Sequence, residues 1–385
     1  MKRWIQSIAL ALASVAVLLV LLEAGVRLFV PTSRWLFLDG AADWKLDLQL
    51  GWVNQPDLDV TSQTPYGSVR FRTNPDGLIP ATAARAKAPG TTRIMIFGDS
   101  MVVGRFFGQD EIYSGRLERA LRERGLPVEV INAGVQGYST DQALLLMERW
   151  VPTYRPDVVI YGSTLNDYGG NSLDTAYGQA KPSFRLDDAQ RLRLSLPKLR
   201  AKIESFGQGP RRWLQDSALY RFVQPGIFLL RARLFGLQER ILLGAEQGLY
   251  IGNATVAELD WKLYEALVVR MEQDARKFGA RFVFFAHPEV GEVWEPYIQS
   301  VCKQLQVERK EYDPFTMERR LIEMAHRRNL EFLPLIQAFR DQSRRGPFHL
   351  IPVDAHLNPA GHALLAEILA ERLAPELAAP KAEAH

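Results

Sequence analysis

A serine stands directly after an apolar run in this chain, at a place where a folded sheet could present it to a substrate. Residues 94–97 are all apolar, and Gly98, Asp99 and Ser100 follow them. Open α/β sheets place their sites outside the carboxyl ends of the strands, and a glycine lets the backbone turn sharply there. Ser100 is therefore the candidate nucleophile. Because a Gly-Asp-Ser tripeptide also arises by chance, this assignment depends on the residues that accompany it.

Two further predicted strands end in groups that could donate hydrogen bonds. Gly137 follows the strand expected over residues 128–133, and Asn166 follows the one expected over 157–161. Parallel strands end at the same edge of a sheet, so both residues would lie near Ser100. Acyl transfer requires a nucleophile beside donors that stabilise the tetrahedral oxyanion, here a backbone N–H and an amide NH₂. Alternatively, both residues have only structural roles: Gly137 allows the chain to turn, and Asn166 stabilises a loop.

A base for Ser100 is expected near the C-terminus. Asp354 and His356 stand just before the last predicted helix, over residues 359–373. A histidine can take the serine proton, and a carboxylate can fix its tautomer and stabilise the imidazolium. His362 competes for this role, but it falls at the start of the helix, where it is expected to pack or cap. The spacing of histidines and carboxylates does not suggest a metal site, and no cofactor is expected.

These residues need a sheet that brings the strand ends together. Apolar runs of strand length alternate with segments of helical periodicity, which predicts an α/β fold with a doubly wound, flavodoxin-like and mostly parallel sheet covered by helices on both faces. The expected strands are 93–97, 128–133, 157–161, 281–285 and 331–335. The expected helices are 113–124, 140–150, 259–278, 316–328 and 359–373. The domain is expected to span residues 93–375, followed by a polar tail over 376–385.

An insertion over residues 171–260 interrupts the alternation. Residues 182–194 suggest a hairpin that turns at Asp187 and Asp188. The following stretch, 198–240, is basic and aromatic. It could lie on an anionic bilayer surface, or it could be a helical cap whose arginines are solvated and whose apolar residues pack on the sheet.

The N-terminus suggests a membrane anchor. Lys2 and Arg3 precede residues 4–22, which carry no charge. At about 1.5 Å per residue, this helix would be roughly 28 Å long, close to the thickness of a bilayer's hydrocarbon core. The flanking cations predict a cytoplasmic N-terminus and a catalytic domain on the periplasmic or extracellular side. A cleaved signal peptide is the alternative. An irregular strap with short strand-like runs, such as 68–72, is expected over residues 31–92.

Composition excludes several classes of function. The net charge is only +3, so there is no polycationic surface to argue for nucleic-acid binding. Cys302 is the only cysteine, which rules out an intrachain disulfide and a zinc site built from several thiolates. With 385 residues, of which 47% are hydrophobic, the chain can bury the core of one elaborated domain or of two.

The strand-end blocks and the Asp354/His356 pair resemble the SGNH/GDSL hydrolase superfamily, over roughly residues 93–170 and 350–375. The resemblance implies a membrane-anchored, exported serine esterase that removes O-acyl groups from a cell-envelope glycan or lipid. It implies Ser100 as nucleophile, His356 as base, Asp354 as the acid that orients it, and Gly137 and Asn166 as oxyanion donors.

Two departures from the family pattern affect this interpretation. Thr164 stands two residues before Asn166, where the family usually has glycine. Asp354 and His356 are separated by one residue instead of two, a spacing similar to that of alginate O-acetylation proteins. The second departure leaves open an O-acetyltransferase that uses the same residues with a membrane-bound O-acyltransferase as partner. A non-catalytic envelope assembly subunit that keeps the fold is a further alternative.

Overall fold

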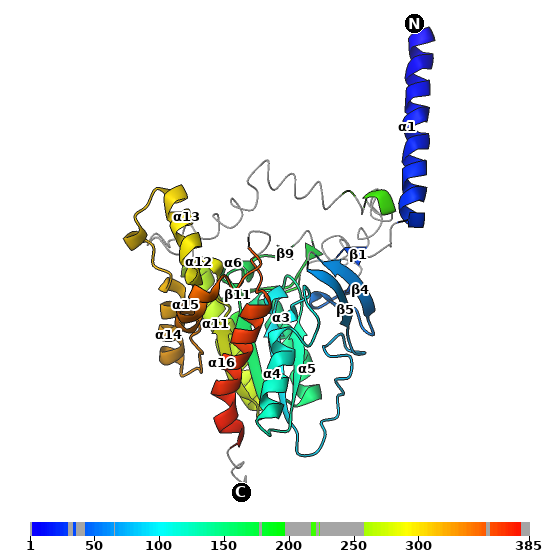
Figure 1. Cartoon of the computed structure of the whole chain (residues 1–385). Helices are drawn as coiled ribbons and strands as arrows, with labels where there is room; N and C mark the ends of the chain where they lie inside the picture. The colour runs from blue at the N-terminus through cyan, green and yellow to red at the C-terminus, as the bar shows by residue number, and fades with distance from the viewer. Residues whose placement is uncertain are drawn as a thin grey trace.

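The computed structural model in Figure 1 shows the course of the chain. The structure describes residues 2–29, 34–35, 43–64, 66–176, 179–196, 217–220, 223, 258–351 and 355–378.

Four parallel strands form the central sheet. Their order is β13 (Arg281–Ala286), β8 (Val158–Ser163), β6 (Thr92–Gly98) and β7 (Val128–Gly134). Nearly every residue of these strands is buried, as expected for a parallel sheet with both faces covered. The doubly wound parallel sheet predicted from the sequence is confirmed. The strand predicted over residues 331–335 is wrong, because only an isolated bridge between Phe284 and Phe332 forms there. Pro334, which has no N–H to donate, interrupts that segment.

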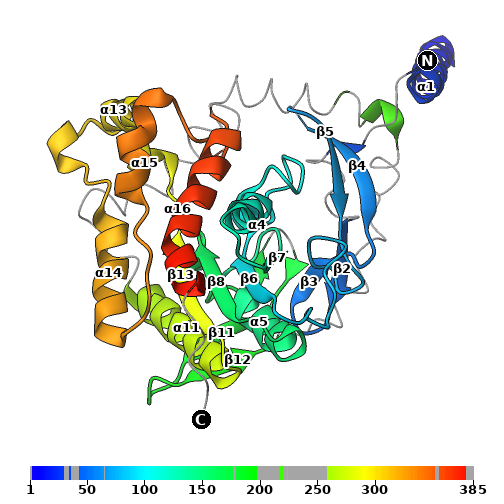
Figure 2. The same cartoon turned by 60° about the horizontal axis from the view of Figure 1, so that its bottom comes forward.

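Helices cover both faces of the sheet (Figure 2). On one face α5 (Thr140–Tyr154) and α11 (Glu258–Lys277) pack over Met95 and Phe97 of β6. On the other face α4 (Tyr113–Glu123) and α16 (Pro359–Ala378) pack over Ile94 and Ile96. Successive strand side chains point to opposite faces, so one apolar strand supplies both cores. Other α-helices after β6 in the described part of the chain are α3 (Ser100–Val103), α6 (Asp167–Gly170), α12 (Val290–Val293), α13 (Glu295–Leu305), α14 (Thr316–Arg328) and α15 (Ile336–Gln342).

Short strands lie before the central sheet in the chain and between its strands β8 and β13. β1 (Arg34–Trp35), β4 (Asp59–Thr64) and β5 (Gly67–Arg72) form one small sheet, and β2 (Trp44–Asp47) pairs with β3 (Gly51–Asn54). β9 (Thr175–Ala176) pairs with β10 (Gln179–Ala180). The predicted hairpin is confirmed as β11 (Ser183–Leu186) and β12 (Leu192–Ser195). Most of the basic stretch 198–240 lies outside the described residues.

The segment before the sheet is tied to the loop that follows β7. The indole N–H of Trp52 donates to the Gln136 carbonyl (2.9 Å), and the Tyr138 hydroxyl donates to the Trp52 carbonyl. The Asn54 amide donates to the Gly134 carbonyl (2.9 Å). Trp52 and Asn54 are both buried. These contacts make residues 50–54 a support for the loop at the carboxyl end of β7.

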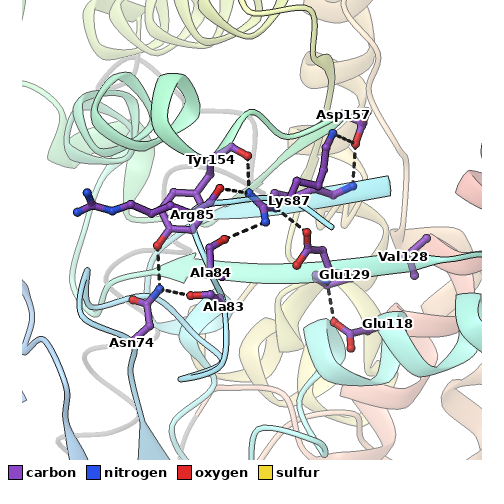
Figure 3. A network of polar contacts seen from close by, with 12 residues as sticks. Asn74, Ala83, Ala84, Arg85, Lys87, Glu118, Val128, Glu129, Tyr154 and Asp157 are labelled. Carbon is purple, nitrogen blue, oxygen red and sulfur yellow. Dashed lines mark hydrogen bonds and ion pairs between the residues drawn. The ribbon is translucent and has the colours of Figure 1, made fainter. Parts of the chain in front are cut away.

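A network of polar contacts that includes Ala84, Glu129 and Tyr154 lies at the amino ends of the central strands (Figure 3). Arg93 is fully buried at the start of β6. Its Nη atoms donate to the carbonyls of Ala84, Arg85 and Tyr154, at 2.6–2.8 Å, and its Nε donates to Glu129 (2.8 Å). A buried charge is tolerated only when it is paired and hydrogen-bonded, and these four acceptors meet that condition. The network lies far along the strands from Ser100 and supports the fold.

The helix α1 (Lys2–Phe29) covers the segment predicted as an anchor over residues 4–22. Within the part of the chain that the structure describes, however, no helix is both long enough and apolar enough to cross a membrane.

Candidate active site

The chain turns sharply where β6 ends, and the candidate nucleophile begins the next helix. Ser100 is the first residue of α3, a single turn that ends at Gly104. The Asp99 carboxylate accepts a hydrogen bond from the Met101 N–H (2.9 Å) and so caps this turn. Gly104 has a φ of 61°, a left-handed conformation that favours glycine. Ser100 is thus presented at the carboxyl end of β6, as the sequence predicts.

Three glycines at neighbouring strand ends form the surface on which α3 rests. Gly98 of β6 is in register with Gly134 of β7 and with Gly162 of β8. A Cβ added at any of them would meet the Val102 side chain, at 2.4 Å from Gly98, 2.9 Å from Gly134 and 3.2 Å from Gly162. The absence of side chains therefore lets the helix that carries Ser100 lie directly on the edge of the sheet.

The structure brings the two predicted oxyanion donors close together. Gly137, with a φ of 76°, lies in the loop after β7. Asn166 precedes α6 after β8, and its Nδ2 donates to the carbonyl of Tyr138, the residue next to Gly137 (3.3 Å). β7 and β8 flank β6, so these donors come from the two strands beside the one that ends at Ser100. Their action on an oxyanion stays a prediction.

Thr164 connects the nucleophile turn with the Asn166 loop. Its side chain is buried, and its Oγ1 donates to Asp99 Oδ2 (2.9 Å). The same hydroxyl contacts Asn166 Oδ1. Its backbone N–H donates to Asp167 Oδ2 (2.7 Å), which closes the turn between β8 and α6. Asp99 and Asp167 thus accept structural hydrogen bonds beside the candidate catalytic positions.

A short antiparallel pairing holds the segment that contains His356. The Leu350 N–H donates to the His356 carbonyl (2.9 Å), and His349 forms a bridge with Leu357. The His349 Nε2–H donates to the Pro288 carbonyl (2.8 Å). Because Pro288 follows β13, this bond ties the His356 segment to the same edge of the sheet that carries Ser100. The sequence analysis missed His349, whose role depends on a partner 61 residues away.

His356 lies near the nucleophile turn. Its ring centroid is 5.1 Å from that of Phe106. Burial raises the pKa of Asp99, and hydrogen bonds together with an electrostatic interaction with His356 lower it in part. Burial likewise raises the pKa of Glu289 to about 7, an increase that Asp99 reinforces and His356 opposes. His356 is therefore within electrostatic range of the residue next to Ser100. Asp354, its predicted partner, lies outside the described residues.

Three other histidines at this edge are buried and neutral. Burial lowers the pKa of His287 to about 3, of His349 to about 4 and of His362 to about 3. The Nδ1–H of His287 donates to the Ser163 carbonyl (3.0 Å). His362 Nδ1 accepts from the Tyr113 N–H (3.3 Å), and the His362 ring stacks on the Tyr113 ring. The expectation that His362 packs is confirmed, and His356 remains the candidate base.

A known protein family matches the part of the chain that contains the strand-end residues. Residues 96–224 match the GDSL-like Lipase/Acylhydrolase family. The matched segment contains Ser100, Gly137 and Asn166, and it ends before His356. No curated protein matches the chain.

Several solved structures are similar to the chain at low sequence identity. The acetyl xylan esterase AlAXEase has a TM-score of 0.41 and 14% identity, over 73% of this chain and 99% of that chain. TesA has a TM-score of 0.39 and 12% identity, over 74% and 99%. A catalytic mutant of Axe2, an acetylxylan esterase from Geobacillus stearothermophilus, has a TM-score of 0.37 and 13% identity, over 76% and 97%. Structural similarity at such low TM-scores does not support a functional assignment, so the comparison with known families depends on the family match. Residues 96–224, about a third of the chain, are therefore similar to a GDSL-like lipase/acylhydrolase domain.

Proposed function

We propose that this protein is a serine esterase that cleaves O-acyl esters through a covalent acyl-enzyme. Ser100 Oγ attacks the ester carbonyl while His356 takes the hydroxyl proton. The tetrahedral oxyanion accepts hydrogen bonds from the Gly137 N–H and from Asn166 Nδ2. Its collapse releases the alcohol, which receives the proton from His356. A water molecule, deprotonated by His356, then attacks the acyl-enzyme and releases the carboxylic acid and free Ser100.

One observation supports this proposal: three adjacent parallel strands are followed at the same edge of the sheet by a serine, a glycine loop and an asparagine, and the asparagine contacts the glycine loop. β7, β6 and β8 are neighbours in the sheet, and the Asn166 amide donates to the carbonyl of the residue after Gly137. Residues so far apart in sequence meet there because parallel strands end at one edge. In the same proposal Asp354 orients the His356 imidazole.

The test is covalent labelling combined with turnover. Wild type is expected to hydrolyse p-nitrophenyl acetate and to react with a fluorophosphonate probe, and Ser100→Ala is expected to do neither while keeping its circular dichroism spectrum. Ser68→Ala, on the exposed strand β5, is the matched control and should behave as wild type. Full turnover by folded Ser100→Ala would refute the mechanism.

The substrate proposed is an O-acylated glycan or lipid of the cell envelope. The same residues would carry transfer of the acyl group to a sugar hydroxyl, with a membrane-bound O-acyltransferase as partner. An isotopically labelled acyl donor incubated with glycan separates the two reactions. Release of free labelled acid supports the esterase, whereas label recovered on the glycan supports the transferase.

We also propose that the domain is exported and held at the cytoplasmic membrane by α1. The uncharged residues 4–22 after Lys2 and Arg3 support this, as do the exposed apolar side chains of α1, such as those of Leu10 and Val20. Expression in cells followed by carbonate extraction and protease digestion of intact spheroplasts is the test. A protein that stays in the pellet and is digested from outside fits the proposal, and one that stays in the soluble fraction contradicts it.

A further inference from the structure

The imidazole of the candidate base His356 lies against an aromatic ring that belongs to the nucleophile side of the site. The ring centroid of Phe106 is 5.1 Å from that of His356, and the two ring planes are tilted by 58°. Phe106 follows Gly104, the residue at which the helix that begins with Ser100 ends, and it is 7% exposed. A general base must keep its nitrogen within hydrogen-bond reach of the proton that it takes. A buried ring that limits how the imidazole can tilt therefore bears on catalysis.

The Phe106 ring is itself supported from the turn between β4 and β5. The ring centroid of Tyr66, in that turn, is 6.4 Å from that of Phe106, with an edge-to-face angle of 78°. The Thr64 hydroxyl oxygen accepts from the Tyr66 N–H (3.1 Å), which fixes the turn. Aromatic pairs favour such edge-to-face arrangements. Tyr66 therefore packs on Phe106, which in turn packs on His356.

A buried ion pair anchors the backbone next to Phe106. Arg105 Nη2 lies 2.5 Å from Asp43 Oδ2, and these side chains are only 3% and 2% exposed. The Arg105 guanidinium also lies over the ring of Phe71 in β5, 4.3 Å from its centroid. Because breaking a buried ion pair leaves an uncompensated charge, such a pair resists displacement. The segment that precedes the central sheet thus fixes the position of Phe106 through both its backbone and its ring.

The neighbouring residue Phe107 has the same support but contacts a different histidine. It is also 7% exposed, and the Tyr66 ring centroid is 5.6 Å from its own. Its ring lies 5.9 Å from that of His362, a buried neutral histidine that takes no part in the proposed reaction. Phe106 and Phe107 are therefore matched in burial and in one of their aromatic contacts, and they differ in which histidine they touch.

We propose that Phe106 is a positioning residue that holds the His356 imidazole in the orientation needed for proton transfer, and that Tyr66 keeps the Phe106 ring in place. This inference rests on the esterase function proposed above. A leucine at position 106 would remain apolar but would lack the planar ring and fill less space. The imidazole could then tilt away from the orientation in which it accepts the serine proton.

The experiment compares Phe106→Leu with its matched control Phe107→Leu. Turnover of p-nitrophenyl acetate is expressed per site titrated to completion with the fluorophosphonate, and the rate of labelling is measured separately. Misplacement by 1 Å can cost about 10²-fold in rate, so a loosened base in Phe106→Leu is expected to lower kcat and the labelling rate roughly 10-fold. KM should stay within about twofold, since the base acts only in the chemical steps. Phe107→Leu should lower the melting temperature by a similar amount and keep kcat within about twofold of wild type.

A double-mutant cycle separates positioning of the base from general damage to the site. If Phe106 acts through His356, Phe106→Leu should have little further effect on the residual turnover of His356→Ala, because residues that act as a unit are not additive. General damage would lower that residual turnover as well, and the two losses would multiply. Should Phe106→Leu not fold, Tyr66→Ala removes the support of the ring at a residue that is 42% exposed. It is expected to lower kcat about threefold, with the same masking by His356→Ala.

Each outcome decides one of the two proposals. Normal kcat in Phe106→Leu, equal losses of kcat in the Phe106 and Phe107 variants, or losses that multiply with His356→Ala would overturn the positioning role. Labelling of Ser100 would leave the esterase proposal standing in each of these cases. Unchanged kcat in Tyr66→Ala would likewise overturn the positioning role, and absence of labelling in wild type would overturn both proposals. A loss of kcat confined to Phe106→Leu, at constant KM and masked by His356→Ala, supports the assignment.

Discussion

Replacing Gly134 with alanine should lift the nucleophile turn off the sheet. The added Cβ would lie 2.6 Å from the backbone nitrogen of Val103 in α3, whereas ordinary contact begins near 3.4 Å, so α3 must move by about 0.8 Å (3.4 − 2.6). The same shift lengthens the hydrogen bond from the Asn132 amide to the Val102 carbonyl, now 2.7 Å. Overpacking of this kind costs about 1–3 kcal/mol of folding free energy. Since Ser100 moves with α3, a displacement approaching 1 Å should lower kcat by up to about 10²-fold.

The assay measures hydrolysis of p-nitrophenyl acetate, the rate of fluorophosphonate labelling, and thermal unfolding followed by circular dichroism. Gly169→Ala is the matched control, because a Cβ added at Gly169 in the short helix α6 would meet no atom within 4 Å. The control should retain the turnover and the unfolding temperature of wild type.

A Gly134→Ala protein with the kcat and stability of wild type would refute the reasoning. It would mean that α3 does not rest on the strand-end glycines, or that the position of Ser100 is not set by their lack of side chains. A loss of stability without a loss of labelling rate would contradict only the inference that the strand-end glycines set the position of Ser100.

Two further predictions concern stability. Arg93→Met should lower the free energy of unfolding by about 3–5 kcal/mol, because it leaves Glu129 and three backbone carbonyls without their donor. Urea denaturation measures this loss. The kcat per folded molecule should be unchanged, because Arg93 lies at the end of the strands opposite Ser100. His362→Gln tests the pH dependence. Burial lowers the pKa of His362 to about 3, so the unfolded chain takes up this proton first as the pH falls below about 6.5. The stability that His362 contributes is therefore lost by about 1.4 kcal/mol per pH unit as the pH falls from roughly 6.5 to 3. In a plot of the free energy of unfolding against pH, the glutamine variant should lack this contribution to the slope. Equal slopes in wild type and variant would contradict the prediction.

The sheet could be predicted because its signals are local. Each of the four strands is six or seven residues long and mostly apolar, which the sequence reveals without reference to any other segment. The helix α14 begins and ends where its periodicity predicts, at Thr316 and Arg328. Residues 331–335 are as apolar as a strand, so their composition predicted one. No strand forms because Pro334 interrupts the hydrogen bonds that would pair this segment with β13.

The convergence of Ser100, Gly137 and Asn166 could be predicted from one topological rule, that parallel strands end at a common edge. The contacts within the site could not. The Thr164 hydroxyl meets a carboxylate 65 positions earlier, and the His349 ring meets a carbonyl 61 positions earlier. Side-chain pairings of this kind depend on backbone placement to within an ångström, which no local pattern encodes. The glycines at 98, 134 and 162 were visible in the sequence, but their shared contact with Val102 was not.

The hydrogen bonds of residues 50–54 define where the folding unit begins. A protein cut at the first strand of the central sheet would lose the indole and amide that serve the Gln136 and Gly134 carbonyls. It would also lose the Leu50 carbonyl, which accepts from the fully buried amide of Gln142 at 2.8 Å. The loop that carries Gly137 would then have its polar backbone exposed on one side and unpaired. The folding unit therefore starts before Leu50, ahead of the segment that matches the acylhydrolase family.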